Sequence, residues 1–237
     1  MSNILSLNKV SRSYSVREKV INVFSDLDIF IEKGEKVAII GPSGSGKTSI
    51  LNIAGLIERP NSGSVSINDY EVNWTLDKEI SDLRKKNIGY VFQFNNLLSD
   101  FTILENIAFP LIINGISKNE ALEKANDFIN HVNLSHRGNN YPNQVSGGEQ
   151  QRAAIARALI GKPSLIIADE PTGNLDSKTS LSVISLFNEL VEEYNCSLFL
   201  ATHNIDIANL QDRVRCRTGW KSGHVATRSC SYSVAKS

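Results

Sequence analysis

The sequence contains little cysteine. Three cysteines, Cys196, Cys216 and Cys230, occur among 237 residues, and none belongs to a CxxC pair or a histidine cluster. An odd number without such spacing argues against a disulfide framework and against a zinc site. A chain of this length can bury a hydrophobic core of its own without cross-links. We therefore expect a globular protein of a reducing compartment.

Long apolar runs are also missing. The longest ones, such as residues 37–40, contain only a few residues, whereas a membrane-spanning helix needs about 20. The N-terminus lacks the basic region, apolar core and cleavage site of a signal peptide. The sequence thus predicts a cytosolic protein that does not itself cross a membrane.

The formal net charge is zero, but the charges are unevenly distributed. Residues 1–212 hold all 25 acidic residues and 19 of the 25 basic ones, which gives this part a net charge of −6. A nucleic-acid-binding domain usually carries a basic stripe on its folded body. Nucleic acid is therefore not an expected partner.

Short apolar runs alternate with longer segments of helical period, which is typical of an α/β fold with a largely parallel sheet. Four runs are continuous enough to be strands covered on both faces: residues 37–40, 89–92, 165–168 and 197–201. Helices are predicted over residues 117–132, which begin with Ser117 and Glu120 at capping-box spacing, and along an apolar stripe from Leu181 to Val191. The N-terminal part, with apolar residues at positions 4–7, 29–31 and 65–67, reads instead as an antiparallel β-lobe.

A glycine-rich segment follows the first predicted strand and precedes a helix through Ile50 and Leu51. Strand, glycine-rich turn and helix are the context in which a P-loop binds phosphate, through backbone N–H groups and the helix N-terminus. Lys47 would reach the β- and γ-phosphates, and the Thr48 hydroxyl would bind Mg²⁺. We expect nine residues to bind nucleotide: Gly41, Pro42, Ser43, Gly44, Ser45, Gly46, Lys47, Thr48 and Ser49.

Two adjacent carboxylates, Asp169 and Glu170, end the predicted strand at residues 165–168. A P-loop enzyme needs a second acid for its metal ion and a base for the attacking water. We expect Asp169 to face Mg²⁺ and Glu170 to accept the proton of the water. Two acids at a strand end are as often a solvated turn, so this interpretation depends on the P-loop upstream.

A second pair of glycines opens a predicted helix. The segment contains Ser146, Gly147, Gly148 and Glu149, and two glycines at a helix N-terminus can hold a phosphate group. One γ-phosphate cannot occupy two such places in one chain, so we expect this segment to serve the nucleotide held by a second copy. The alternative is an N-cap serine followed by a glycine turn.

These motifs, in this order, resemble the ATP-binding subunits of ABC transporters over nearly the whole chain to about Asp212. The resemblance implies ATP and Mg²⁺ as cofactors and a P-loop NTPase fold with a parallel-sheet core, an N-terminal antiparallel β-lobe and an α-helical lobe at about residues 94–160. It also implies a head-to-tail nucleotide-sandwich dimer and transmembrane permease subunits as partners, at the cytoplasmic face of the inner membrane.

The resemblance also assigns single residues. Gln93 is similar to the Q-loop glutamine, which contacts the metal ion and takes part in catalysis, and His203 is similar to the switch histidine that acts beside Glu170. Asp176 is similar to the D-loop aspartate at the nucleotide. Tyr14 matches the aromatic residue that stacks on adenine.

Residues 92–106 narrow the resemblance to the lipoprotein-releasing LolD type, although Asn95, Asn96 and Ser99 stand where that type usually has two histidines and a proline. Residues 94–106 combine polar and apolar groups suited to receiving a short helix of a membrane partner. The resemblance implies release of lipoproteins from the cytoplasmic membrane. The alternatives are a macrolide-export-like or cell-division-like ABC ATPase, a non-transport ABC ATPase and a P-loop kinase.

The end of the chain departs from that pattern. After Asp212, arginines alternate with Val214 and Cys216, which predicts a half-buried edge strand protected by charge. Residues 223–237 contain no acidic residue and only scattered apolar ones, too few to offset the ordering entropy. We expect an ATP-binding domain over residues 1–222 and a mobile tail over 223–237 that is dispensable for ATP hydrolysis.

Overall fold

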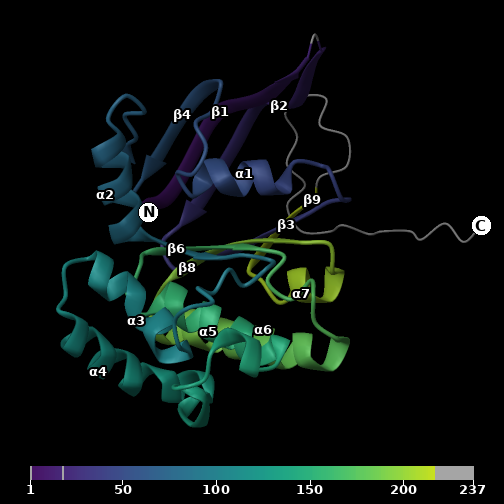
Figure 1. The fold of residues 1–237 in the computed structure, drawn as a ribbon. Helices are drawn as coiled ribbons and strands as arrows, with labels where there is room; N and C mark the ends of the chain where they lie inside the picture. The colour runs from purple at the N-terminus through teal and green to yellow at the C-terminus, as the bar shows by residue number, and fades with distance from the viewer. Residues whose placement is uncertain (1, 18, 217–237) are drawn as a thin grey trace, which may run out of the picture.

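A computed structural model describes residues 2–17 and 19–216. Two β-sheets with a helix between them form the upper part of the molecule in Figure 1, and a layer of helices covers the other face of the lower sheet. The expectation of a mobile tail at residues 223–237 lies outside the described residues. In the part of the chain that the structure describes, no helix has the length and apolar character needed to span a bilayer.

All four strands of the antiparallel sheet lie within the first 71 residues. The predicted N-terminal β-lobe is confirmed, and the short strand at its edge, residues 70–71, is not predicted by the sequence. The strand order of this sheet is β2-β1-β4-β5. The strands are β1 (Asn3–Val16), β2 (Lys19–Glu32), β4 (Ser62–Ile67) and β5 (Tyr70–Glu71). Apolar residues of β1 and β2 such as Leu5, Leu7 and Ile29 are fully buried, so this sheet covers one side of the core.

The parallel sheet brings together strands that are far apart in the sequence, in the order β6-β7-β8-β3-β9. Its strands are β6 (Ile88–Val91), β7 (Leu165–Asp169), β8 (Ser197–Thr202), β3 (Lys36–Ile40) and β9 (Arg213–Cys216). All adjacent pairs are parallel. The four predicted core strands are confirmed to within one residue at each end, and all five strands end at the same edge, where parallel sheets place their ligands.

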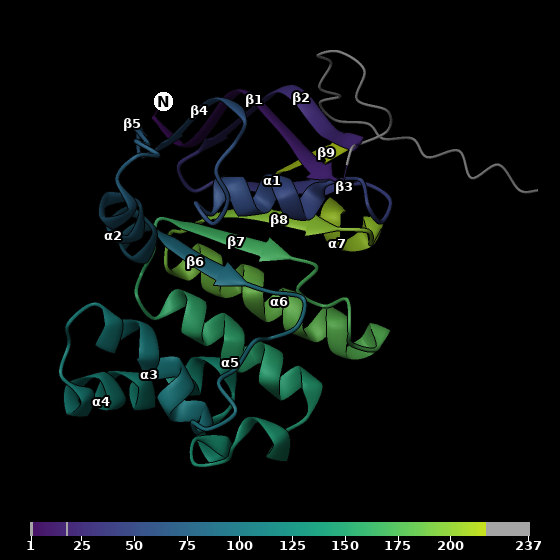
Figure 2. The same ribbon diagram turned by 45° about the horizontal axis from the view of Figure 1, so that its top comes forward.

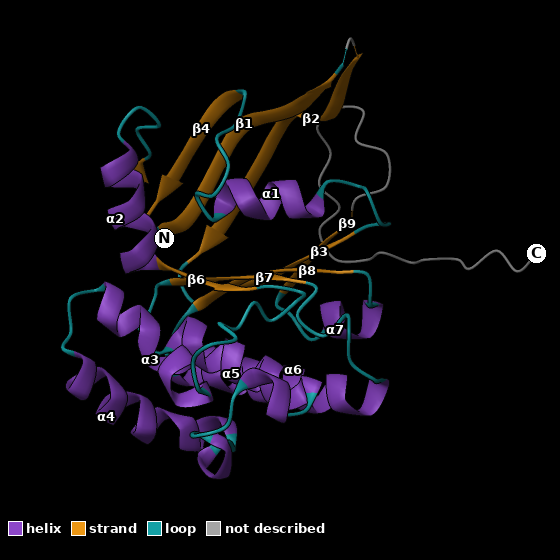
Figure 3. Cartoon of the chain, viewed as in Figure 1, coloured by secondary structure: helices purple, strands orange, loops and turns teal. Residues whose placement is uncertain are grey.

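Helices cover both faces of the parallel sheet. Helix α1 (Lys47–Ala54) lies between the two sheets, and Figure 3 shows four long helices on the opposite face. Those are α3 (Ile103–Ile113), α4 (Lys118–Phe128), α5 (Gly147–Leu159) and α6 (Ser177–Glu193). Helix α2 (Asp77–Asn87) lies beside β6, and the short α7 (Ile205–Asn209) follows β8 (Figure 2). Three 3₁₀ segments complete the helical layer: Ile129–Val132, Ser135–Arg137 and Pro142–Gln144.

The parallel sheet separates the two large clusters of the hydrophobic core. Ile166 and Ala168 of β7 face the helical layer, whereas Leu165 and Ile167 face α1 and the antiparallel sheet. The strand is therefore apolar on both faces, which is why it appears in the sequence as a continuous apolar run. The sheet is held from both sides.

Three local predictions need correction. The helix predicted over residues 117–132 is α-helical only to Phe128 and continues as a 3₁₀ turn. Leu181, placed on the apolar stripe of α6, is 56% exposed. At β9 the edge strand is confirmed, but Arg215 is buried while Val214 is half-buried. Arg215 is opposite Ile39 on a sheet that is covered on both faces. The alternation of arginine with apolar residues along β9 therefore does not place every arginine in solvent.

Candidate active site

The glycine-rich segment connects the end of β3 to the start of α1, as predicted. Gly44 and Gly46 have φ values of 72° and 85°, in the left-handed region that favours glycine. Gly46 is the N-cap of α1 and provides no side chain, so the first N–H groups of the helix are free to bind an anion. The Ser45 hydroxyl is buried and has no hydrogen-bond partner among the described residues.

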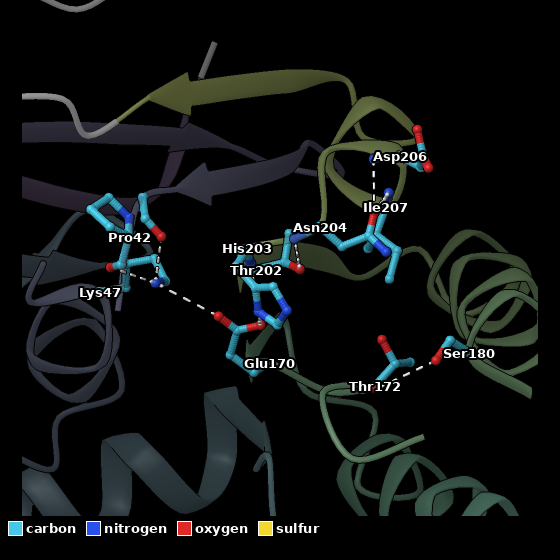
Figure 4. A network of polar contacts seen from close by, with 11 residues as sticks. Pro42, Lys47, Glu170, Thr172, Ser180, Thr202, His203, Asn204, Asp206 and Ile207 are labelled. Atoms are coloured by element: carbon cyan, nitrogen blue, oxygen red, sulfur yellow. Dashed lines mark hydrogen bonds and ion pairs between the residues drawn. The ribbon is translucent and has the colours of Figure 1, made fainter. Parts of the chain in front are cut away.

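Lys47 is a buried cation at the first position of α1. Its Nζ donates to the carbonyl oxygens of Gly41 at 2.8 Å and Pro42 at 3.2 Å, so these two residues hold the lysine beside the loop (Figure 4). Nζ also lies 3.6 Å from Oε1 of Glu170. A buried ammonium fixed next to free helix N–H groups gives this end of the site a positive character.

Asp169 and Glu170 lie at the carboxyl end of β7, facing that loop. Burial raises the pKa of Asp169, an effect that the nearby Thr48 hydroxyl opposes. Oδ1 of Asp169 is buried without a hydrogen-bond partner in the described part of the chain. A buried carboxylate oxygen left free beside a threonine hydroxyl is the donor set that Mg²⁺ prefers, so these residues fit the ion.

Glu170 is held by His203, which follows β8. Its Oε2 lies 2.7 Å from Nδ1 of His203 and accepts a bond from the His203 backbone N–H at 3.2 Å. The backbone of Glu170 is in the left-handed region, with φ 46°, which is uncommon for a residue with a side chain. The turn therefore directs this carboxylate, which is 13% exposed, toward both Lys47 and His203.

These groups line one cleft of about 670 Å³. Twelve of the site residues predicted from the sequence line this cleft: Tyr14, Ser43, Gly44, Ser45, Gly46, Lys47, Thr48, Ser49, Gln93, Asp169, Glu170 and His203. Gly41 and Pro42 lie behind the cleft as acceptors for Lys47. Val23 also lines the cleft, and no sequence signal marked it.

Tyr14 is a fixed aromatic group at this cleft. Its hydroxyl donates to Glu58 at 2.9 Å and lies 3.1 Å from the Ser49 hydroxyl, and the guanidinium of Arg12 lies 4.4 Å from its ring centre. One residue on α1 and two others therefore orient the ring. No sequence motif predicts the roles of Arg12 and Glu58, because these roles depend on contacts between segments that are distant in the chain.

The sequence profile of the ABC transporter family matches residues 24–173, a segment that contains the glycine-rich loop and both carboxylates. The chain belongs to the ABC transporter family. It is 44% identical over 217 residues to the lipoprotein-releasing system ATP-binding protein LolD of Rickettsia bellii, covering 90% of this chain and 95% of that protein. The LolD protein of Ehrlichia ruminantium (strain Gardel) is 46% identical over 215 residues, covering 90% of this chain and 94% of that one.

Solved structures of ABC cassettes have the same fold. A dimeric post-hydrolysis state of the cassette MJ0796, bound to ADP and phosphate, superimposes with a TM-score of 0.82 at 38% identity, covering 90% of this chain and 93% of that one. CbiO1 of Clostridium perfringens, part of an ABC transporter complex, gives a TM-score of 0.80 at 26% identity, covering 91% of this chain and 85% of that one. The predicted P-loop fold is confirmed.

Residues 146–149, which we call the signature segment, lie outside the cleft. Ser146 is the N-cap of α5, and its side chain and that of Glu149 form a reciprocal capping box. A bond from the Ser146 backbone N–H and the nearby Arg137 lower the pKa of Glu149 to about 2. The N-cap that the sequence allowed as an alternative is therefore present, and it is compatible with binding by the free N–H groups of the helix.

The two signature glycines have different surroundings. A Cβ at Gly148 would lie 2.6 Å from Cγ2 of Thr179, whereas one at Gly147 would lie 3.4 Å from Cδ2 of Leu175. Gly148 is therefore required for the close packing of α5 on α6, and Gly147 is on the exposed side. Asp176, which likewise does not line the cleft, is the N-cap of α6 and accepts bonds from the N–H groups of Lys178 and Thr179.

Proposed function

We propose that this chain is the ATP-hydrolysing subunit of an ABC transporter that drives the release of lipoproteins from the cytoplasmic membrane. The observation that carries the proposal is the cleft in which Lys47, Asp169 and Glu170 meet at the carboxyl edge of the parallel sheet. The names of the LolD relatives, which match most of the chain, support lipoprotein as the cargo.

The polar loop residues, the lysine, the carboxylates and the tyrosine of the cleft each have a role in ATP hydrolysis. The backbone N–H groups of residues 43–49 surround the phosphates, while the carbonyl groups of Gly41 and Pro42 hold Lys47. Lys47 neutralises the β- and γ-phosphates, and Tyr14 stacks on adenine. Thr48, Gln93 and Asp169 would hold Mg²⁺, which, when bound, offsets the charge on the transferred phosphoryl group.

Hydrolysis requires a base for the attacking water. Glu170 is the candidate, because its carboxylate is fixed at the rim of the cleft by two contacts from His203. His203 orients the Glu170 carboxylate toward the attacking water and stabilises the site while Glu170 accepts the proton of that water.

A second copy completes the site. Ser146, Gly147, Gly148, Glu149 and Asp176 do not line the cleft of their own chain, so we assign them to the nucleotide held by the partner in a head-to-tail dimer. The dimeric cassettes that this chain resembles support that arrangement.

Permease subunits supply the membrane contact. A groove of about 300 Å³ lies next to the loop that follows Gln93, where it can accept a short helix of a partner at the cytoplasmic face of the inner membrane. Its lining includes Phe92, Asn96, Leu98, Phe109, Pro110 and Arg157. The neighbouring Phe94 is 69% exposed, so an apolar ring is available for such a contact.

The decisive experiment compares Glu170→Gln with Glu123→Gln, a matched change at an exposed position of α4. Glu170→Gln keeps the shape of the side chain but removes the base and a charge that repels the γ-phosphate. We expect it to bind Mg-ATP, lose hydrolysis and form a dimer in light scattering. Hydrolysis at the wild-type rate, or a monomer at saturating ATP, would contradict the assignment.

The cargo needs its own test. Transmembrane proteins that co-purify with this chain from native membranes are reconstituted with it in vesicles that contain a radiolabelled lipoprotein. We expect ATP-dependent release with the wild-type chain and none with Glu170→Gln. Release that does not require ATP would contradict the transport role.

A further inference from the structure

A short network of hydrogen bonds joins the loop after Gln93 to helix α5. The guanidinium of Arg157 donates to two consecutive carbonyl oxygens, with Nη1 2.7 Å from that of Asn96 and Nη2 2.8 Å from that of Asn95. The planar fork of arginine fixes both carbonyls at once. The loop backbone is therefore anchored on α5, about three turns into that helix.

The side chain of Asn95 continues the network. Its Nδ2 donates to Oε1 of Gln150 at 2.7 Å, and Nε2 of Gln150 donates to the carbonyl oxygens of Pro142 at 2.8 Å and Val145 at 3.2 Å. The Gln150 amide thus uses its acceptor and both of its donors. Gln150 is half-buried, so water does not readily replace these bonds.

The bonds of Gln150 end directly beside the signature segment. Val145 precedes Ser146, the N-cap of α5 and the residue that begins this segment. At the other end, Asn174 Nδ2 donates to the carbonyl oxygen of Gln93 at 3.0 Å. Asn95, two residues after Gln93, is thus linked to Val145 through the side-chain amide of Gln150. A displacement of the Gln93 loop is therefore transmitted to Val145.

We propose that Gln150 is a positioning residue that makes the orientation of the signature segment depend on the position of the Gln93 loop. This inference rests on the proposed roles of Gln93 and of residues 146–149 at the nucleotide. With the Asn95–Gln150 bond in place, ATP contact at Gln93 sets the signature segment in the orientation that receives the partner's nucleotide. Without it, the loop stays attached to α5 through Arg157, about three turns away from the signature segment, and the direct link to Val145 is lost.

A purely structural role for Gln150 makes different predictions. Loss of packing alone would lower the melting temperature, and it would give no special relation between Gln150 and Asn95. Residues coupled through one bond are non-additive, because the second change removes nothing that the first has left. The test must therefore combine both positions and must separate nucleotide binding by one chain from dimer formation.

The experiment uses Gln150→Met, Asn95→Ala and the double variant in the Glu170→Gln background, with Gln144→Met as matched control. Gln144 is exposed, and its side chain accepts one bond from the Tyr141 N–H. Fluorescent-ATP titration measures binding by the single chain, and light scattering with Mg-ATP measures the concentration for half-dimerisation.

We expect each single variant to bind nucleotide within about two-fold of the parent but to need about ten-fold more protein to dimerise, as loss of one half-buried hydrogen bond predicts. The double variant should need no more protein than either single variant, and Gln144→Met should match the parent. Unchanged dimerisation in both single variants, or additive losses, would overturn the inference.

Two further outcomes are separable. If the Glu170→Gln parent itself fails to dimerise, the proposed function fails rather than the role of Gln150, and the inference falls with it. If Gln150→Met does not fold, Asn95→Ala, which changes only a surface loop, carries the same expectation of a ten-fold loss. Dimerisation of Asn95→Ala at the parental concentration would then refute the coupling.

Discussion

Glu170 and His203 form a pair across two hydrogen-bonded strands, with Oε2 of the glutamate 2.7 Å from Nδ1 of the histidine. The glutamate follows β7 and the histidine follows β8, so both are placed by the same sheet. The histidine side chain is 66% exposed, whereas that of the glutamate is 13% exposed. The histidine is therefore open to solvent, whereas the carboxylate that it contacts is nearly covered.

Removing His203 should uncouple ATP binding from hydrolysis. We expect His203→Ala to lower the rate of phosphate release by about 100-fold or more, as loss of an oriented acid–base partner does, while ATP binding stays within a few-fold. Phosphate release and nucleotide titration measure the two effects. A rate close to that of the wild type would show that Glu170 does not need the histidine.

Tyr14 should act through its ring rather than through its hydroxyl. Tyr14→Ala should weaken ATP binding by about ten-fold or more, because stacking of a base on an aromatic ring contributes about 1–3 kcal/mol. Tyr14→Phe keeps the ring and loses the bonds to Glu58 and Ser49, so a loss of only a few-fold is expected. Calorimetric titration distinguishes them, and equal affinity in Tyr14→Ala and wild type would contradict stacking.

The two signature glycines should respond differently to alanine. Gly148→Ala places a methyl group 2.6 Å from Cγ2 of Thr179 and should destabilise the fold by about 1–3 kcal/mol. Adding Thr179→Ser, which removes only that methyl group, should restore most of the melting temperature. Gly147→Ala, with 3.4 Å to Leu175, serves as the control and should leave it nearly unchanged. Equal melting temperatures for Gly147→Ala and Gly148→Ala would contradict this difference.

Glu149 should make the free energy of unfolding depend on pH in the acidic range. Its pKa is lowered from the ordinary 4.5 to about 2 in the folded chain, so its carboxylate stabilises the fold above about pH 4.5. That contribution is lost as the pH falls toward 2. Urea unfolding should show a difference in stability between wild type and Glu149→Gln that is largest near pH 5 and shrinks at about pH 3. A difference independent of pH would mean that the charge of Glu149 is not involved.

The sequence predicts the P-loop and the carboxylates well because their geometry is local. Strand, turn and helix follow one another along residues 36–54, and the two acids end a strand that is apolar on both faces. Parallel strands then bring these ends to one edge of the sheet without further information. The role of Gly41 and Pro42 as acceptors for Lys47, and the place of Val23 in the cleft, needed the structure.

Contacts between distant segments could not be predicted in the same way. Gln150 and Arg157 contact residues more than 50 positions away, and helical periodicity marks a half-buried position without naming what lies opposite. Leu181 shows the same limit, because the apolar stripe of α6 is wider than the surface that its neighbours cover. Arg215 shows that alternation fails where both faces of a strand are covered.

Strand pairing also determines how this site tolerates mutation. Asp169 is opposite Ala201, and Ile40 is opposite Thr202, so the loop, the carboxylates and the histidine leave three adjacent strands at nearly the same level. Their separation is then a multiple of the spacing of about 4.8 Å between hydrogen-bonded strands. Backbone hydrogen bonds between the strands, rather than side-chain packing, therefore set the distances between the reacting groups. Substitutions in the helical layer can therefore accumulate, altering which partner is recognised, while the distances between the reacting groups stay fixed.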